Sequence, residues 1–274
     1  MRYLNMYDSI SCLNCLACMS ACSMENRMRM ERDEGVSLER SVNDYLPRSY
    51  YLRPWRREIG EYPNARLLVA FEHCRHCEIA QCLIHCPAKA IERRPTGQVV
   101  INASACIGCR TCRDVCPFNI PIYDRQTGKA GKCIGCYDRV EARMEPACVT
   151  ACPSQALISG SEEDVIAEGE RRVAQYAERL GRGYVLYGKD KINRVVGRLG
   201  WVSIAAREDA EHYDLFANPA KVTMIARDVF KIGGAVGTAG VVAGAALHGL
   251  YLFTKRKDHV TAAETKTEEV SDEQ

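Results

Sequence analysis

The sequence predicts an α+β fold in which a short strand, a cysteine-rich loop, a short helix and a second strand recur as an internal repeat. Three observations of the 274-residue chain support this fold. All 16 cysteines lie before residue 153, in four groups of four. Short strand-like runs stand directly before or after these groups. Near the C-terminus, one uncharged segment of 22 residues is long enough to form a membrane span.

The strand-like runs follow a regular order. Residues 4–10 (LNMYDSI) lead into the first cysteine group, and residues 66–72 (RLLVAFE) lead into the second. Residues 90–102 form a predicted hairpin with a Pro-Thr-Gly turn at 95–97, and residues 155–160 (QALISG) close the fourth group. These apolar runs are too short for a large core. We therefore expect bound metal to supply much of the folding free energy, and the metal-free chain to be unfolded or molten.

The cysteine groups share one spacing pattern. The first and third follow C-x2-C-x2-C-x3-C, the second is C-x2-C-x4-C-x3-C and the fourth is C-x2-C-x11-C-x3-C. Proline follows the last cysteine of three groups, and Ser23 takes that place in the first. In chain order the groups are Cys12, Cys15, Cys18 and Cys22; Cys74, Cys77, Cys82 and Cys86; Cys106, Cys109, Cys112 and Cys116; and Cys133, Cys136, Cys148 and Cys152.

Three kinds of site compete for these cysteines. Disulfides are typical of small secreted chains, but repeated two-residue separations suit a shared metal better. Structural zinc sites favour two CxxC pairs joined by a spacer. In the tighter run found here, three thiolates bind one cluster and the fourth reaches a second, which is the bacterial ferredoxin pattern for paired [4Fe–4S] clusters. The spacing favours iron–sulfur over zinc and zinc over disulfides, and it predicts four [4Fe–4S] clusters.

The predicted clusters change the charge of the chain. The formal net charge of +2 treats every cysteine as neutral. A [4Fe–4S] cluster with four thiolates carries roughly −2 when oxidised, so the loaded chain would carry roughly −6. The near-neutral sequence therefore gives no support to nucleic-acid binding.

Residues 23–73 separate the first two groups without any cysteine. They are rich in arginine and tyrosine and include Trp55. One interpretation is a solvated connecting lobe. The other is a docking surface, because Arg, Tyr and Trp are enriched at interface hot spots. The sequence leaves both open.

A helix is predicted after the fourth group. Between residues 162 and 182 the apolar side chains recur at helical spacing, opposite a charged face. Gly181 and Gly183 end the helix, and an extension with two strand-like runs, 183–188 and 200–206, continues to about Asn218. The apolar stripe consists of Val165, Ile166, Val173, Tyr176, Ala177 and Leu180.

The uncharged segment Ile232–Phe253 predicts a single transmembrane helix. Its glycines recur four residues apart, which suits close packing on another membrane helix. Basic residues flank it on both sides, so the charge distribution sets no orientation. His248 lies inside the span, either near the interface or in contact with a quinone or a partner's haem site. We expect a disordered acidic tail after it and no N-terminal signal peptide.

These features divide the chain into four parts. Residues 1–160 form a four-cluster domain with an insertion at 23–73, and residues 161–230 form the helix and a connecting extension. Residues 231–254 form the transmembrane helix, and residues 255–274 form the polar tail.

The sequence contains no nucleophile motif, no HExxH and no phosphate-binding loop. A cluster held by four cysteines has no open position for a substrate and passes one electron at a time. The chain is therefore predicted to be a non-catalytic electron-transfer subunit of a larger oxidoreductase, with one end at the membrane. A structural zinc protein or membrane scaffold is the alternative from a different class.

Four motifs resemble a known family. They are CPFNIP (116–121), KCIGCYDRV (132–140), EPACVTACP (145–153) and HCRHCEIAQCLIHCP (73–87). They are similar to the four-cluster iron–sulfur β subunit of membrane-bound formate dehydrogenase. That subunit belongs to a wider family of ferredoxin-like electron-transfer subunits of molybdopterin oxidoreductases and hydrogenases. The resemblance implies two pseudo-symmetric ferredoxin-like units, each with two clusters.

The resemblance also implies which cysteines share a cluster. The first group pairs with the fourth, and the second pairs with the third. The implied ligand sets are Cys12, Cys15, Cys18 and Cys152; Cys22, Cys133, Cys136 and Cys148; Cys74, Cys77, Cys82 and Cys116; and Cys86, Cys106, Cys109 and Cys112.

Partners and location follow from the same resemblance. It implies a catalytic subunit with a molybdenum or tungsten pterin, or in the alternative a hydrogenase, and a membrane subunit with haem b or a quinone site. The anchor would contact membrane lipid. The cluster domain is expected on the exoplasmic (periplasmic) side by export together with its partner, although the cytoplasmic face stays open.

Overall fold

The structure is a computed structural model. It describes residues 2–33, 51–123, 128–213 and 215–221, together with the helical residues Ala243, Ala246, Leu247 and Leu250. The chain divides into two compact units, Met1–Lys221 and Val222–Gln274. The elements described below all belong to the first unit.

Apart from those four helical residues, the predicted span Ile232–Phe253 lies outside the described residues, and so do His248 and the tail after residue 254. In the part of the chain that the structure describes, no helix is long and apolar enough to cross a membrane. The membrane helix therefore stays a prediction.

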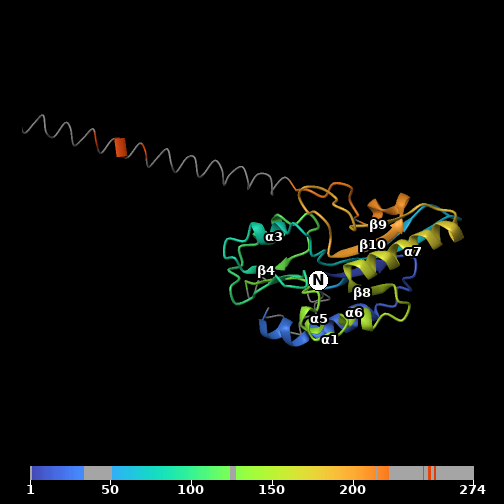
Figure 1. The fold of residues 1–274 in the computed structure, drawn as a ribbon, viewed down its shortest axis with the longest axis horizontal. Coiled ribbons are helices and arrows are strands. Elements are labelled where there is room, and N and C mark those ends of the chain that lie inside the picture. Colours follow the sequence, from blue (N-terminus) through green and yellow to red (C-terminus); the bar gives the residue numbers. More distant parts are fainter. Residues whose placement is uncertain are drawn as a thin grey trace, which may run out of the picture. The chain divides into compact units, whose positions relative to one another are not determined.

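A four-stranded sheet organises the first unit (Figure 1), in the order β8-β1-β10-β9. β1 (Tyr3–Asp8) lies antiparallel to β8 (Leu157–Ser161) and parallel to β10 (Trp201–Ala206), which pairs antiparallel with β9 (Tyr184–Tyr187). The runs predicted at 4–10, 155–160, 183–188 and 200–206 form these four strands. Their assembly into one sheet, which joins the N-terminus to the C-terminal extension, did not follow from the sequence.

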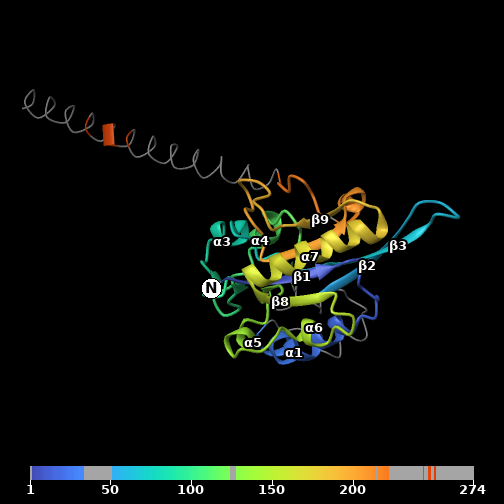
Figure 2. The same ribbon diagram turned by 45° about the vertical axis from the view of Figure 1, so that its right-hand side comes forward.

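Helix α7 (Glu162–Leu180) covers one face of this sheet (Figure 2). This helix confirms the prediction from the apolar stripe, although it ends at Leu180, two residues before the predicted end. Ser161 caps its start by accepting a hydrogen bond from the Asp164 N–H at 3.1 Å, and Gly181, with φ +63°, ends it. Gly169 faces the sheet so closely that a Cβ there would lie 2.7 Å from Leu186.

Three two-stranded hairpins complete the β structure of the described residues. β4 (Ile91–Arg93) and β5 (Val99–Ile101) confirm the hairpin predicted at 90–102. β6 (Ile122–Tyr123) pairs with β7 (Ala130–Gly131). β2 (Arg53–Ile59) and β3 (Arg66–Glu72) form a longer ribbon that reaches away from the sheet (Figure 2).

The other helices of the first unit, within the residues that the structure describes, are mostly short. They are α1 (Ala17–Asp33), α3 (Gln81–Ile84), α4 (Thr111–Asp114), α5 (Tyr137–Glu141) and α6 (Ala147–Thr150), followed after β10 by the 3-10 turns η2 (Arg207–Asp209) and η3 (Glu211–Tyr213). Within the segment 23–73, the continuation of α1 to Asp33 and the strand β2 were not predicted. Residues 34–50 of that segment lie outside the described part.

The two faces of the sheet have different cores. Between α7 and the sheet the buried side chains are aliphatic and include Leu4, Met6 and Ile204. On the other face, Trp201 and Tyr7 pack in a cluster that also contains Cys18, Cys22 and Cys148. A further core, around β4 and β5, contains Cys112 and touches Cys82, Cys86 and Cys106. The cysteine groups are therefore part of the core on one side of the sheet only.

Candidate metal-cluster sites

All four cysteine groups begin with the same loop geometry. The second residue after the first cysteine has a left-handed backbone in every group, at Asn14, His76, Gly108 and Gly135, with φ between +45° and +70°. This conformation is uncommon for non-glycine residues and turns the chain sharply. At two of these positions the turned N–H donates to the first thiol of its group, from His76 to Cys74 Sγ at 3.5 Å and from Gly135 to Cys133 Sγ at 3.3 Å.

The third cysteine of each group is the second residue of a helix, and the fourth follows four residues later. In the three groups with proline after the last cysteine, the chain then closes a tight turn. Its third residue after that cysteine has positive φ and donates its N–H to the cysteine carbonyl at 3.2 Å. In the first group, where Ser23 replaces proline, α1 continues instead. The turn residues are Lys89, Asn119 and Gln155, and the helical cysteines are Cys18, Cys82, Cys112 and Cys148.

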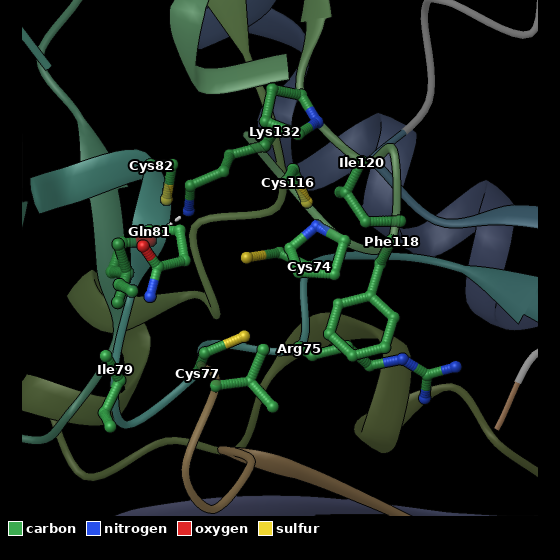
Figure 3. A pocket seen from close by; sticks show the side chains of 15 residues that line it. Cys74, Arg75, Cys77, Ile79, Gln81, Cys82, Cys116, Phe118, Ile120 and Lys132 are labelled. Atoms are coloured by element: carbon green, nitrogen blue, oxygen red, sulfur yellow. Dashed lines mark hydrogen bonds between the residues drawn. The ribbon is translucent and has the colours of Figure 1, made fainter. Parts of the chain in front are cut away.

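One pocket gathers thiols from two groups (Figure 3). Cys74, Cys77 and Cys82 of the second group and Cys116 of the third line it together. The other lining side chains are mostly apolar, including Ile79, Val99, Phe118 and Ile120. The pocket therefore combines four thiols with a surface that excludes water.

A second pocket holds the complementary set. Cys106, Cys109 and Cys112 of the third group line it with Cys86 of the second, against Ile91, Ile101 and Ile107. Here Cys109 is exposed, whereas Cys112 is buried. The Ala90 N–H donates to Cys86 Sγ at 3.3 Å.

Six of the other eight cysteines lie in or against the core that contains Tyr7 and Trp201: Cys12, Cys18, Cys22, Cys133, Cys148 and Cys152. The electrostatic neighbours of Cys18 are Cys12, Cys152 and Cys15, which come from the first and fourth groups. Those of Cys148 are Cys22, Cys136 and Cys133, followed by Cys18. The structure thus brings each predicted ligand set into one neighbourhood, and the assignment of ligands to clusters stays a prediction.

Burial raises the pKa of many of these thiols. Desolvation is the main cause and the charge of neighbouring cysteines adds to it, so that the pKa of Cys18, Cys112 and Cys133 rises to about 12. The pKa of Cys22, Cys77 and Cys148 rises well above its usual value for the same reasons. Four buried thiolates repel one another unless a cationic centre lies between them. The sites therefore suit a cationic metal centre, which binds the deprotonated form and releases the protons.

The donor set also fits a cubane. No disulfide joins any two of the sixteen cysteines. Among the described residues, no three His, Cys, Asp or Glu side chains converge to hold a single metal ion. In a [4Fe–4S] cluster each cysteine binds a different iron, so the thiols stand around a space rather than meet at one point. Hydrogen bonds from backbone N–H groups to the thiols are among the features that set the reduction potential of such clusters.

Two buried polar residues near these sites were not identified from the sequence. Lys132 is 3 % exposed and lines the pocket in Figure 3, where its Nζ donates to the carbonyl oxygens of Val99 and Cys133. His76 is also 3 % exposed, and its Nδ1 accepts from the Val99 N–H at 3.0 Å. Burial lowers the pKa of His76 well below its usual value, so its imidazole is neutral. The only sequence signal was that both residues stand beside ligand cysteines.

A family model described as a 4Fe-4S dicluster domain matches residues 65–162, which contain the second, third and fourth cysteine groups. The iron–sulfur subunit of nitrate-inducible formate dehydrogenase from Escherichia coli K12 is 35% identical over 173 residues, or 63% of this chain and 58% of that protein. A formate dehydrogenase iron–sulfur subunit from Haemophilus influenzae is 34% identical over 174 residues, or 63% of this chain and 55% of the relative. The chain thus spans little more than half the length of these two relatives.

The B subunit of anaerobic dimethyl sulfoxide reductase from Escherichia coli K12 is 34% identical over 159 residues, which cover 58% of this chain and 73% of that protein. Its match and those to the formate dehydrogenase subunits agree with the resemblance carried by the cysteine motifs. The chain belongs to the family of iron–sulfur subunits with a 4Fe–4S domain that includes those of formate dehydrogenase and anaerobic dimethyl sulfoxide reductase.

Proposed function

We propose that this chain is a non-catalytic electron-transfer subunit that carries four [4Fe–4S] clusters and connects a catalytic subunit to a membrane partner. The observation that supports it most is the presence of four neighbourhoods of four thiols each, with no cysteine left over. Such clusters accept and release one electron each. The protein's own contribution is to hold the thiols, exclude water and keep neighbouring sites close together.

The proposed ligand sets are the four named above, with the first and fourth groups crossing over and the second and third groups crossing over. The third and fourth cysteines of one group stand four residues apart at a helical turn, yet they belong to different sets. Each such turn therefore links two adjacent clusters covalently, which suits short, fixed distances for electron transfer.

The two ferredoxin-like units are part of the same proposal. α1 and α6 pack together and carry cysteines of the first and fourth groups, and α3 and α4 pack together and carry those of the second and third. Each pair of groups would form one unit with two clusters.

The partners are proposed from the family. The relatives are named as subunits, which makes them parts of larger enzymes. A formate dehydrogenase-like catalytic subunit with a molybdenum or tungsten pterin is the first candidate. A hydrogenase or another molybdopterin reductase is the alternative. At the other end we propose a membrane subunit with haem b or a quinone site, in anaerobic respiration.

The anchor is proposed from the sequence. Ile232–Phe253 would span the bilayer and pack on a partner helix through its glycines, with His248 inside the span. The cluster domain would lie on the exoplasmic side after export with its partner. Cutting the chain after Lys231 should leave a cluster-loaded domain that no longer reduces the quinone pool. Unchanged sedimentation with membranes would argue against this anchor.

Metal analysis tests the proposed cofactors. Anaerobically purified chain should contain about sixteen iron and about sixteen acid-labile sulfide atoms, as four cubanes require. Zinc in place of iron, with little sulfide, would instead support the structural zinc protein.

Paired cysteine variants test the order of the clusters between the catalytic subunit and the membrane. In the proposed order, the cluster with Cys15 lies beside the catalytic subunit and the cluster with Cys109 lies nearest the membrane. Cys109→Ser should leave reduction of a soluble dye by the catalytic subunit intact and abolish transfer to quinone or haem. Cys15→Ser should block entry of electrons from the catalytic partner. If Cys109→Ser loses catalytic coupling while the other clusters still reduce the membrane acceptor, the order is reversed.

A further inference from the structure

Lys132 lies where two of the thiol neighbourhoods meet. It lines the pocket of Cys74, Cys77, Cys82 and Cys116, and it directly precedes Cys133 of another set. Figure 3 shows its side chain extending across the pocket with the ammonium group beside Cys82. Lys132 is thus a positively charged residue between two proposed clusters.

The position of its charge is well defined. Nζ donates to the carbonyl oxygen of Val99, on β5, and to that of Cys133 at 3.2 Å. Two acceptors on different segments hold the ammonium in place and prevent the side chain from turning toward solvent. With 3 % of the residue exposed, the charge is also shielded little by water or salt.

The negative charges that act on Lys132 come from cysteines of both sets. Cys74 and Cys82 belong to one set and Cys133 to the other. A buried ammonium is costly unless it is paired with negative charge. A thiolate-bound cluster supplies that negative charge. Its net charge is roughly −2 when oxidised and one unit more negative when reduced. Lys132 therefore interacts more strongly with the reduced state of either cluster.

We propose that Lys132 sets the reduction potentials of these two clusters, raising that of the Cys74, Cys77, Cys82 and Cys116 cluster most and that of the Cys133-containing cluster less. The proposal rests on the cluster assignment made above. In each transfer one electron leaves one cluster as the next accepts it, and Lys132 keeps its proton throughout. Its charge stabilises the electron at the junction between the two proposed units, where the two inner clusters are adjacent.

Two substitutions separate charge from hydrogen bonding. Lys132→Gln keeps a donor for the two carbonyl groups but removes the charge, and Lys132→Arg keeps both. Lys189→Gln is a matched control. The Lys189 side chain is 33 % exposed and forms an ion pair with Glu170 at 2.8 Å. Lys189 does not line either cysteine pocket. The full-length, anaerobically purified proteins are analysed first for iron and sulfide, and then by potentiometric titration followed by electron paramagnetic resonance.

In Lys132→Gln we expect the reduction equilibrium constant of one cluster to fall at least tenfold, a shift of about 59 mV to lower potential for one electron. A second cluster should shift less, and the other two should not shift. The reduction potentials of Lys132→Arg and of Lys189→Gln should equal those of the unmodified chain.

Two results would overturn the proposal. In the first, Lys132→Gln contains full iron and sulfide but all its potentials are unchanged. In the second, Lys132→Gln lacks iron whereas Lys132→Arg is fully loaded, which would make Lys132 a residue for cluster assembly. Absence of iron and sulfide from the unmodified chain would contradict the proposed function itself, and the first measurement detects this separately.

Discussion

The sheet with α7 and the cysteine-rich side of the molecule are built on different principles. Between α7 and the sheet the core is aliphatic and contains no cysteine, with Leu4, Val165 and Val202 fully or almost fully buried. On the cysteine side, apart from the longer helix α1, strands of two or three residues and helices of four or five alternate with loops, and thiols occupy the core. The first region can gain stability from burial of apolar surface, whereas the second needs metal between its thiols.

Asp8 connects the two regions. It ends β1, is fully buried, and accepts hydrogen bonds from the Ser11 hydroxyl at 3.1 Å, just before Cys12. From α7 it accepts hydrogen bonds from Arg172 at 3.1 Å and Tyr176 at 2.6 Å. The first cysteine loop is therefore held to the sheet and α7 by an ordinary polar network, which does not depend on metal.

Removal of iron should have the largest effect and should separate the two regions. After oxidation and chelation, we expect backbone amides in α3, α4 and α6 to lose protection from hydrogen exchange completely. Amides of α7 should keep part of theirs, because the core between α7 and the sheet contains no thiol. Hydrogen exchange with mass spectrometry measures this, and equal loss of protection in both regions would contradict the comparison.

Substitution of a glycine in a cysteine loop should have the second largest effect. Gly108 has φ +70°, and a Cβ there would overlap the carbonyl oxygen of Gly128, so Gly108→Ala must displace the loop between Cys106 and Cys109. We expect this variant to lose about four of sixteen iron atoms, those of one cubane. Gly181→Ala is the control, because Gly181 has φ +63° but a Cβ added there would meet no atom within 4 Å. It should keep all its iron and lose only about 1 kcal/mol of stability.

Loss of the Asp8 carboxylate should weaken the connection between the regions. Asp8→Ala leaves Arg172 and Tyr176 without their buried acceptor, although Arg172 keeps its ion pair with Glu168 at 2.7 Å. We therefore expect the free energy of unfolding to fall by about 3 kcal/mol, the lower end for a broken buried pair. Anaerobic urea unfolding followed by circular dichroism measures it. Lys189→Ala, at an exposed pair, should cost at most about 1 kcal/mol, and an equal loss in both variants would show that Asp8 has no special role.

The smallest effect is expected at the start of α7. Ser161→Ala removes the hydroxyl that accepts from the Asp164 N–H, and should lower the stability by about 1 kcal/mol. Because the cap lies in the cysteine-free region, iron content and visible absorption should stay unchanged. A change in the cluster spectrum would show that the two regions are coupled more tightly than the packing indicates.

The sequence alone determined the features that depend on residues near one another in the chain. The cysteine spacings predicted the cluster sites, and the alternation of strand-like runs and the apolar stripe at 162–182 predicted β1, β3, β8 and α7. Gly181 located the end of that helix to within two residues. Each of these follows from a local periodicity or a local backbone requirement.

Only the tertiary structure decided which distant segments meet. The parallel pairing of β1 with β10, the network around Asp8 and the burial of Lys132 between two thiol sets all join parts of the chain far apart in sequence. A lysine beside a cysteine has the same local pattern whether its ammonium faces water or a cluster. Its role is determined by packing from other elements, and that information is not carried by any short stretch of residues.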